Sequence, residues 1–563
     1  MSLTAGAALL TRLKEIGVDY IFANSGTDFP PIIEGLAEAA AKDLPLPEAL
    51  VMPHEHAAMG MAHGYYLASG RAQAVMAHTN VGLANCAIGA INAAMENIPV
   101  LLFSGRTPVT EAGRLGTRTV PIGWGQEMRD QTALVREATK WDYELRFPEQ
   151  TVEVVDRAYA VANSTPKGPV YVSLPREALC EVVDDDRTGG GPSMAPVSLY
   201  AGAELIAQAA ALLSRATNPV IFAQHGAGSA EAFEALGALA DKWGIPVCQY
   251  WAVQLAIPTT HPMATGPDPK ALVENADVIL VLDALAPWSP EVHQSGAQCK
   301  IIHMGPDPLK ARTPIRNFRS DVSIACELGQ GVMALAAAME ALGEPAPAIA
   351  ARRSRVAKSN ADDRRALTAR AEAGAHGVMT KEWVSLTLSK ALEGRRARVL
   401  SELGCPMGPM VLDHHQAWYQ EPHAGGLGWS FPAALGMQLH DRKQLIVATM
   451  GDGSYMFANP VACHQIAEAL ALPILVVILN NSEWGAVRQS VLCVYPDGFA
   501  SRANRMPLTS LAPVPDFARI ASASRAWSAT VTQASDLEDS IQEALAHIET
   551  NRTLALLDVR VRP

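Results

Sequence analysis

Short apolar runs alternate along the chain with longer alanine-rich segments in which apolar residues recur at every third or fourth position. Runs that are apolar on both faces are typical of parallel strands covered by helices, and their alternation with helical segments is typical of βαβ units. We therefore predict an α/β protein whose parallel sheets are flanked by helices. The predicted strands include residues 72–78, 100–105, 170–174, 219–224, 278–283, 300–304, 444–451 and 474–480.

Two stretches interrupt this rhythm and divide the chain. Residues 184–196 are acidic and then rich in glycine and proline, and residues 343–375 lead from a proline-rich segment into a charged, helical pattern. A chain of 563 residues is also too long for a single core. We predict two linkers and three domains, at residues 1–183, 198–342 and 376–563.

The first and third predicted domains repeat the same order of helix, strand, helix and strand. When Pro99 is aligned with Pro473, the preceding strands superpose without a gap and His78 falls opposite Asp452. Ligands of open parallel sheets bind at the carboxyl ends of the strands. We therefore predict a duplicated unit, with a Rossmann-like domain between the two copies and with both His78 and Asp452 at functional edges.

The composition and net charge of the chain argue against some classes of protein, in particular those that bind nucleic acid or membranes. Apolar residues make up 49% and charged residues 18% of the chain, and the formal net charge is -12. An acidic chain of this kind is a poor partner for nucleic acid or anionic membranes. The eight cysteines form no C-x-x-C pair, and no apolar run is long enough to span a membrane. We expect buried, reduced cysteines, an N-terminal segment that is a helix and not a leader, and a cytoplasmic protein.

The sequence Gly451-Asp452-Gly453-Ser454 ends one predicted strand, and Asn480-Asn481 ends the next. Carboxylate and amide oxygens at neighbouring strand ends are ligands suited to Mg²⁺. We expect Asp452 and Asn481 to bind the ion, with a backbone carbonyl at Glu483 as the third protein ligand. Gly453 would let the backbone approach a diphosphate, to which Ser454 would donate hydrogen bonds.

This pattern resembles that of the thiamine diphosphate-dependent decarboxylase and carboligase superfamily, and the resemblance extends over nearly the whole chain. It implies thiamine diphosphate and Mg²⁺ as cofactors, held by the third domain. In the run of residues 425–428, Leu427 matches the bulky aliphatic residue that wedges under the cofactor. The cofactor-binding positions implied in this domain are Leu427, Gly451, Asp452, Gly453, Ser454, Asn481, Trp484 and Gly485.

The first domain carries the matching catalytic positions. Glu55, in the sequence His-Glu-His-Ala-Ala, resembles the family glutamate that contacts N1′ of the aminopyrimidine and so promotes loss of the C2 proton. The benzoylformate decarboxylase branch is matched at His78, which implies a proton shuttle, and at Thr27, which implies a contact to the substrate carboxylate. A hydrogen-bonded structural histidine remains the alternative for His78.

Other segments depart from the family patterns. The flavin-binding run of acetolactate synthases is replaced by residues 283–290, so we do not expect FAD, and Trp288 in this segment is expected to line the pocket. Residues 226–228 form only half of a dinucleotide fingerprint and are not expected to bind NAD, whereas ADP or CoA stays open. Residues 495–515 are expected to form a long loop. An arginine in or before this loop would either contact a substrate carboxylate or remain solvated. The arginines concerned are Arg488, Arg502 and Arg505.

The resemblance implies a lyase that cleaves a C–C bond of a 2-oxo acid, giving an aldehyde by decarboxylation or a longer product by carboligation. An acetolactate synthase-like carboligase or acyl transferase and an acyl-CoA lyase are the alternatives. Glu55 together with the metal motif argues against a non-enzymatic cofactor-binding protein. The family pairs the first domain of one subunit with the third domain of another, so we expect a homodimer or homotetramer; the substrate side chain stays open.

Overall fold

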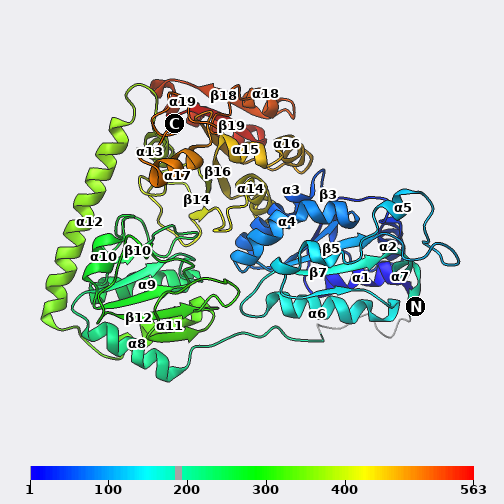
Figure 1. Ribbon diagram of the computed structural model, residues 1–563, viewed down its shortest axis with the longest axis horizontal. Coiled ribbons are helices and arrows are strands. Elements are labelled where there is room, and N and C mark those ends of the chain that lie inside the picture. Colours follow the sequence, from blue (N-terminus) through cyan, green and yellow to red (C-terminus); the bar gives the residue numbers. More distant parts are fainter. Residues whose placement is uncertain (1, 184–192, 563) are drawn as a thin grey trace.

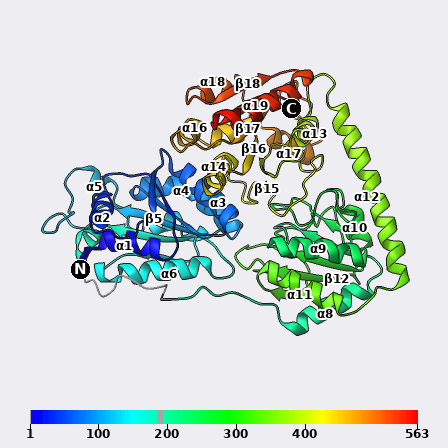
Figure 2. The same cartoon turned by 180° about the vertical axis from the view of Figure 1, so that it is seen from behind.

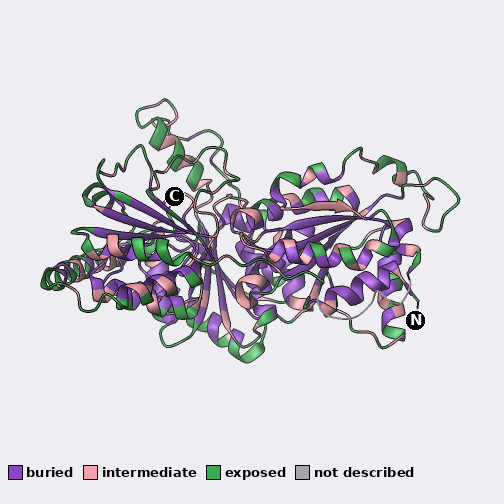
Figure 3. Cartoon of the chain, turned by 90° about the horizontal axis from the view of Figure 1, so that it is seen from below, coloured by how far each residue is buried: buried purple, intermediate pink, exposed green. Residues whose placement is uncertain are grey.

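The computed structural model describes residues 2–183 and 193–562. It contains three parallel β-sheets, each flanked by helices, with the third sheet lying beside the other two (Figure 1). Figure 3 shows the buried strands between helices whose outer faces are exposed. The predicted α/β class is confirmed. A short antiparallel pair, β1 (Leu3–Thr4) and β8 (Val182–Val183), ties the two ends of the first domain together.

The first and third sheets have the same topology. Taken in order across each sheet, the strands are β3-β2-β4-β5-β7-β6 and β15-β14-β16-β17-β19-β18, so corresponding strands occupy corresponding places. This shared order confirms the predicted duplication, with His78 after β4 and Asp452 after β16. The first sheet consists of β2 (Tyr20–Ala23), β3 (Glu48–Val51), β4 (Gln73–Ala77), β5 (Val100–Arg106), β6 (Asp142–Glu144) and β7 (Val170–Pro175), and the third of β14 (Ala397–Glu402), β15 (Trp418–Gln420), β16 (Leu445–Gly451), β17 (Leu475–Asn480), β18 (Trp527–Val531) and β19 (Ala555–Arg560).

Helices cover both of these sheets. Those of the first domain are α1 (Ala5–Glu15), α2 (Pro30–Ala41), α3 (Glu55–Ser69), α4 (Thr79–Met95), α5 (Ile122–Gly125), α6 (Thr151–Asn163) and α7 (Arg176–Cys180). Those of the third domain are α13 (Lys381–Ala391), α14 (Ser430–His440), α15 (Asp452–Phe457), α16 (Pro460–Ala469), α17 (Gly485–Val494), α18 (Phe517–Ser522) and α19 (Leu537–Asn551).

The middle domain is a smaller parallel sheet of order β10-β9-β11-β12-β13. In its half fingerprint, Gly226 and Gly228 have positive φ, and a Cβ on Gly228 would lie 2.3 Å from the backbone nitrogen of Gly329. These glycines let the turn pack closely on a neighbouring helix. The domain consists of β9 (Pro219–Ala223), β10 (Val247–Cys248), β11 (Val278–Leu282), β12 (Lys300–Gly305), β13 (Val322–Ala325), α8 (Ala203–Arg215), α9 (Ala230–Trp243), α10 (Lys270–Asn275) and α11 (Leu328–Glu340).

The second predicted linker is a single long helix. Helix α12 (Pro347–Ala373) runs along the outer edge of the molecule from the middle to the third domain, as Figure 2 shows from behind. Its buried Arg352 donates hydrogen bonds to the backbone carbonyls of Trp243, Gly244 and Ala216. The helix is therefore fixed to the middle domain along part of its length. Residues 184–192 of the first predicted linker lie outside the described residues.

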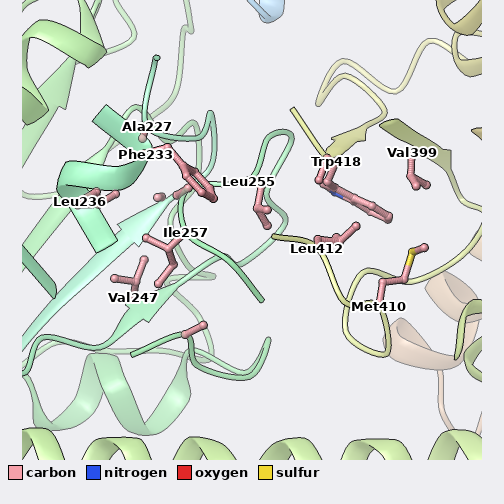
Figure 4. Close-up of a cluster of buried hydrophobic side chains, with 14 of the residues drawn as sticks. Ala227, Phe233, Leu236, Val247, Leu255, Ile257, Val399, Met410, Leu412 and Trp418 are labelled. Carbon is pink, nitrogen blue, oxygen red and sulfur yellow. The ribbon is translucent and has the colours of Figure 1, made fainter. Parts of the chain in front are cut away.

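The third domain packs against both of the others. Helices α3 and α14 approach so closely that a Cβ on Gly64 would lie 1.9 Å from the carbonyl oxygen of Ala433, and one on Gly436 would lie 2.1 Å from that of Met61. On the other side, the middle and third domains share an apolar core, in which Leu255 faces Trp418 and Leu412 (Figure 4). The sheet ends of the third domain are thus held rigidly against both neighbours.

Most cysteines are buried, as predicted, but Cys180 is half-buried and Cys493 is exposed. Cys493 lies on α17, in which no residue is buried. The prediction is wrong for these two because Cys180 is the last residue of α7, where the chain leaves the core, and Cys493 lies on a helix with no buried residue. Among the described residues, no helix is both long and apolar enough to cross a membrane.

Candidate functional site

A cavity of about 1000 Å³ lies between the middle and third domains, at the carboxyl ends of β16 and β17. Every position that the sequence implicated in the third domain lines it. These are Leu427, Gly451, Asp452, Gly453, Ser454, Asn481, Glu483, Trp484 and Gly485. Cavities at the carboxyl ends of parallel strands are the usual ligand sites of such sheets.

The carboxylate of Asp452 is buried at the first residue after β16. Its two oxygens accept hydrogen bonds from the backbone N–H groups of Gly453, at 2.9 Å, and Ser482, at 2.7 Å. Burial raises the pKa of Asp452 above its usual range. Among the residues that the structure describes, no cationic side chain forms an ion pair with Asp452. A metal ion bound here would therefore stabilise the charged form of this carboxylate.

The two asparagines at the end of β17 have different surroundings. Asn480 is buried and donates to Asp558 of β19, whereas Asn481 lines the cavity. The side-chain oxygen of Asn481 accepts a hydrogen bond from the backbone N–H of Glu483, and Ser482 between them has a positive φ of 58°. This tight turn brings the Ser482 N–H to Asp452, so Asp452 and Asn481 belong to one constellation.

The side chain of Glu483 turns away from this constellation, since it accepts hydrogen bonds from Thr509 and Arg488. Its backbone carbonyl accepts one from the Gly485 N–H at 2.8 Å, which leaves one lone pair of that oxygen free. The backbone carbonyl of Glu483, and not its side-chain carboxylate, is therefore the group that suits the predicted role of third Mg²⁺ ligand.

Two small residues shape the floor of the cavity. A Cβ on Gly453 would lie 2.2 Å from the ring of Trp484, so only glycine allows this approach. The hydroxyl of Ser454 is buried without a hydrogen-bond partner. An unsatisfied buried hydroxyl is costly, and it indicates a polar ligand at this point.

Leu427 lines the cavity from a turn that a buried glutamate holds in place. Glu402, at the end of β14, accepts hydrogen bonds from the backbone N–H groups of Gly428 at 2.5 Å and Ser430 at 2.7 Å. Gly428 has a positive φ, and a Cβ there would lie 2.6 Å from the backbone nitrogen of Ala458. Sequence reasoning missed Glu402 and did not predict β14, although a carboxylate just after the short apolar run at residues 399–400 could have indicated both.

In the first domain, Glu55 begins α3 and is buried. Its carboxylate accepts a hydrogen bond from the side-chain amide of Asn85 at 3.0 Å. A Cβ on Gly82 would lie 2.7 Å from the other carboxylate oxygen, so the glycine makes room for the acid. Within residues 2–183 and 193–562, the Glu55 carboxylate makes no other hydrogen bond and no ion pair.

His78 lies between two side chains that sequence reasoning missed. The buried carboxylate of Asp28 makes a short hydrogen bond to Nδ1 and also accepts the backbone N–H of Thr79. The amide of Gln126 lies 3.0 Å from Nε2. The hydrogen bond to Asp28 raises the pKa of His78. Asp28 lies next to Thr27 in the sequence, but Gln126 belongs to a loop far along the chain that no motif indicates.

The first-domain residues form a half-site of their own. Thr27 is exposed beside Asp28, and neither Thr27, Glu55 nor His78 lines the cavity of the third domain. The same chain therefore carries two separate groups of predicted site residues.

One prediction about the remaining wall of the cavity needs correction. Trp288 does not line it, because its ring is buried in the middle domain against Phe222 and Phe318. Tyr250 and Trp251 of the middle domain line the cavity instead.

Of the two alternatives for the arginines of the long loop, the structure of this chain agrees with the solvated one, since neither Arg502 nor Arg505 lines the cavity. Arg502 and Arg505 are exposed, and the guanidinium of Arg502 stacks over Phe499. The cavity is instead lined by charged residues that include Lys381 and Glu421. Burial lowers the pKa of Lys381 and raises that of Glu421 to about 7.

Comparisons with known proteins agree along the whole chain. Residues 3–134 match the family model of the thiamine pyrophosphate enzyme N-terminal TPP binding domain, residues 206–335 the central domain, and residues 407–559 the C-terminal TPP binding domain. Sulfoacetaldehyde acetyltransferase of Rhodobacter capsulatus is 27% identical over 98% of this chain and 93% of its own. The large subunit of acetolactate synthase isozyme 3 from Escherichia coli is 25% identical over 100% of this chain and 95% of its own.

Among solved structures, the thiamine diphosphate-dependent 4-hydroxybenzoylformate decarboxylase of Rhodococcus jostii RHA1 has the same fold. It superposes with a TM-score of 0.76 at 21% identity, covering 99% of each chain. The segments matched by the three family models follow the order of the three sheets along the chain.

Proposed function

The chain belongs to the superfamily of thiamine diphosphate-dependent enzymes, and on this premise we propose that it uses thiamine diphosphate and Mg²⁺ to cleave a C–C bond of a 2-oxo acid. The observation that carries the proposal is the constellation on one cavity wall of the buried Asp452 and Ser454 with the half-buried Asn481. Release of CO₂ from a 2-oxo acid, dependent on both cofactors, is its direct test.

The residues present fit both cofactors. Asp452, Asn481 and the carbonyl of Glu483 are the oxygen donors that Mg²⁺ prefers, and the unpartnered hydroxyl of Ser454 can donate to a diphosphate oxygen. Lys381, on the same cavity, offers a positive charge to the diphosphate. The apolar side chain of Leu427 would pack against the rings of the cofactor.

When bound, thiamine diphosphate supplies a thiazolium ring that accepts the electrons of the breaking C–C bond. Glu55 of the first domain would hold the proton at N1′ of the aminopyrimidine, and its burial keeps water from competing for that hydrogen bond. His78 would move protons to and from the substrate through Nε2, with Asp28 fixing Nδ1 and with the amide of Gln126, now 3.0 Å from Nε2, giving way to the substrate. Thr27, exposed at the same edge, would contact the substrate carboxylate.

Replacing His78 by alanine should lower kcat by roughly 10²–10⁴-fold, the usual loss for a general acid or base. Asp28→Asn should cause a smaller loss and should also move the limb of the kcat/KM pH profile that His78 controls to lower pH. The sign follows because Asp28 raises the pKa of His78, so its loss lowers that pKa. A profile of kcat/KM against pH for the three proteins checks this. If Asp28→Asn lowers kcat without moving either limb, Asp28 is only structural.

Within one chain the two half-sites lie apart, so a complete site would need the first domain of one subunit and the third domain of another. We therefore propose a homodimer, or a homotetramer built from such dimers. Exposed apolar side chains on the helices that carry the half-site residues, or next to them, support this: Val81 and Ile91 on α4, Phe457 at the end of α15 and Val461 in the first turn of α16. Exposed apolar clusters of this kind are typical of surfaces that a partner covers.

Mixing two inactive variants tests this arrangement. In a dimer of one Glu55→Gln chain and one Asp452→Ala chain, one site combines the intact Glu55 with the intact Asp452. After joint refolding or co-expression, activity should return to about a quarter of the wild-type value, since about half of the dimers are mixed and each has one intact site. If the mixture stays as inactive as either variant, the two half-sites belong to one chain. Each variant mixed with itself is the control.

The main alternative is a carboligase or acyl transferase that uses the same cofactor. It is supported by the similarity to acetolactate synthase and to sulfoacetaldehyde acetyltransferase, both of which match over nearly their full length. Glu421, buried at the cavity with a pKa of about 7, could serve either reaction as an acid or base. Separate measurement of CO₂ and of ligated products distinguishes the two.

A further inference from the structure

A second cluster of potential metal ligands lies where the three domains meet. Glu96 follows α4 of the first domain, His225 follows β9 of the middle domain, and His423 precedes the turn that carries Leu427. One ligand atom of each residue lies within 4.8 Å of the others. Glu96 and His225 are buried, and His423 also lines the cavity.

The hydrogen bonds of the two histidines determine which ring nitrogens are free. Nδ1 of His225 lies 2.5 Å from the carbonyl oxygen of Asp283, and Nε2 of His423 lies 3.0 Å from that of Trp251. A carbonyl oxygen only accepts, so each of these nitrogens carries its proton. In the neutral rings, the lone pairs are therefore on Nε2 of His225 and Nδ1 of His423.

Both lone pairs face Glu96. Nε2 of His225 lies 2.6 Å from one carboxylate oxygen, and Nδ1 of His423 lies 4.0 Å from the other. Nδ1 of His423 is buried and has no hydrogen-bond partner. The backbone N–H of His423 donates to one oxygen of Glu96 at 2.9 Å, and a proton shared with His225 satisfies the other oxygen. Among the described residues this leaves Nδ1 of His423 unpaired, whereas a cation between the three groups would satisfy this nitrogen as well.

The surroundings of the cluster match those of metal-bound histidines. Such histidines usually donate their other ring N–H to a backbone carbonyl or a carboxylate, and both rings here donate to a carbonyl. The neighbouring carboxylate of Asp283 lies 3.6 Å from Nδ1 of His225 through one oxygen and is paired with Lys310 at 2.6 Å through the other, so Lys310 balances its charge. Glu96 therefore leaves one negative charge at the cluster.

We propose that Glu96, His225 and His423 bind a divalent transition metal of the zinc type. Two imidazole nitrogens and one carboxylate suit Zn²⁺ or Co²⁺ and do not suit Mg²⁺, and three protein ligands leave a fourth position for water. Because each ligand comes from a different domain, the ion fixes the junction of the domains beside the cavity. This inference does not depend on the function proposed for the cavity.

Metal content tests the proposal on the full-length oligomer. The protein is stripped with a chelator, equilibrated with Zn²⁺ in excess Mg²⁺, passed through gel filtration and analysed by mass spectrometry of the metals. We expect about one zinc per chain. Glu96→Gln and His423→Gln should each lower the zinc affinity at least about tenfold, since even loss of an outer partner has this effect. Co²⁺ loading should give visible absorption bands that both variants lose.

Two further variants make the result specific. His414→Gln removes a histidine that is not part of the cluster, so this variant should retain the zinc. If this variant loses the zinc, the binding is adventitious and the proposal is overturned. Asp452→Asn should also retain it, which separates this site from the one proposed for Mg²⁺. Near-UV circular dichroism shows which variants fold. Because the side chain of His423 is the most exposed of the three ligands, we expect its replacement to disturb the junction least. If the folded wild-type protein takes up no zinc or cobalt, or if His423→Gln binds as well as the wild type, the cluster is only a hydrogen-bonded contact.

Discussion

Glu55→Gln should abolish turnover with every substrate while leaving the affinity for thiamine diphosphate nearly unchanged. Glutamine has the size of glutamate, so it keeps the packing against Gly82 and the place beside Asn85. It cannot hold the proton at N1′ as a carboxylate does, and the loss of a general acid or base of this kind is at least about 10²–10⁴-fold in kcat. Exchange of the cofactor C2 proton in deuterated water, followed by NMR, measures this step without any substrate.

The exchange rate should fall together with kcat in Glu55→Gln, and Glu48→Gln serves as the control. Glu48 is an exposed glutamate of the same domain, so its replacement should change neither quantity. Normal exchange in the Glu55 variant would show that another group performs this step and would remove the assigned role of the first domain.

Asp452→Ala should remove binding of thiamine diphosphate and Mg²⁺ altogether. A diphosphate and a carboxylate-lined wall repel each other unless a cation lies between them, and Asp452 is the only buried carboxylate among the proposed Mg²⁺ ligands. In the variant, the backbone N–H groups of Gly453 and Ser482 lose their hydrogen bonds to Asp452. These groups would then face the cavity and bind water, so the fold should survive.

Isothermal titration with thiamine diphosphate in the presence of Mg²⁺ measures this loss, which we expect to exceed about 100-fold in affinity. Asp413→Asn, at an exposed aspartate of the same domain, is the matched control. Wild-type affinity in a folded Asp452→Ala protein would mean that the cofactor is held elsewhere.

The third-domain half of the site could be predicted because its residues stand at the ends of consecutive parallel strands. Strand ends can be read from the apolar runs, and the sheet then brings Asp452 and Asn481 to one edge whatever the rest of the chain does. The duplicated strand order could be predicted for the same reason, since it depends on local patterns that recur.

The partners of these residues could not be predicted in the same way. Glu402 reaches Gly428, and Gln126 reaches His78, across long stretches of sequence. The three-domain cluster arises only from the packing of whole domains, which no local pattern encodes. Trp288 shows the opposite case, in which a prediction from sequence is wrong. Its place after a predicted strand favours the cavity wall, but its side chain packs in the core of the middle domain.

The central claim is tested most directly by incubating the purified chain with a panel of 2-oxo acids that differ in side chain, and by measuring released CO₂ while NMR identifies the products. The account predicts CO₂ from at least one 2-oxo acid, with an aldehyde or a ligated hydroxyketone as the other product, and no CO₂ when either thiamine diphosphate or Mg²⁺ is omitted. Turnover that persists without thiamine diphosphate, or cleavage of acyl-CoA substrates by a cofactor-loaded protein that acts on no 2-oxo acid, would contradict it.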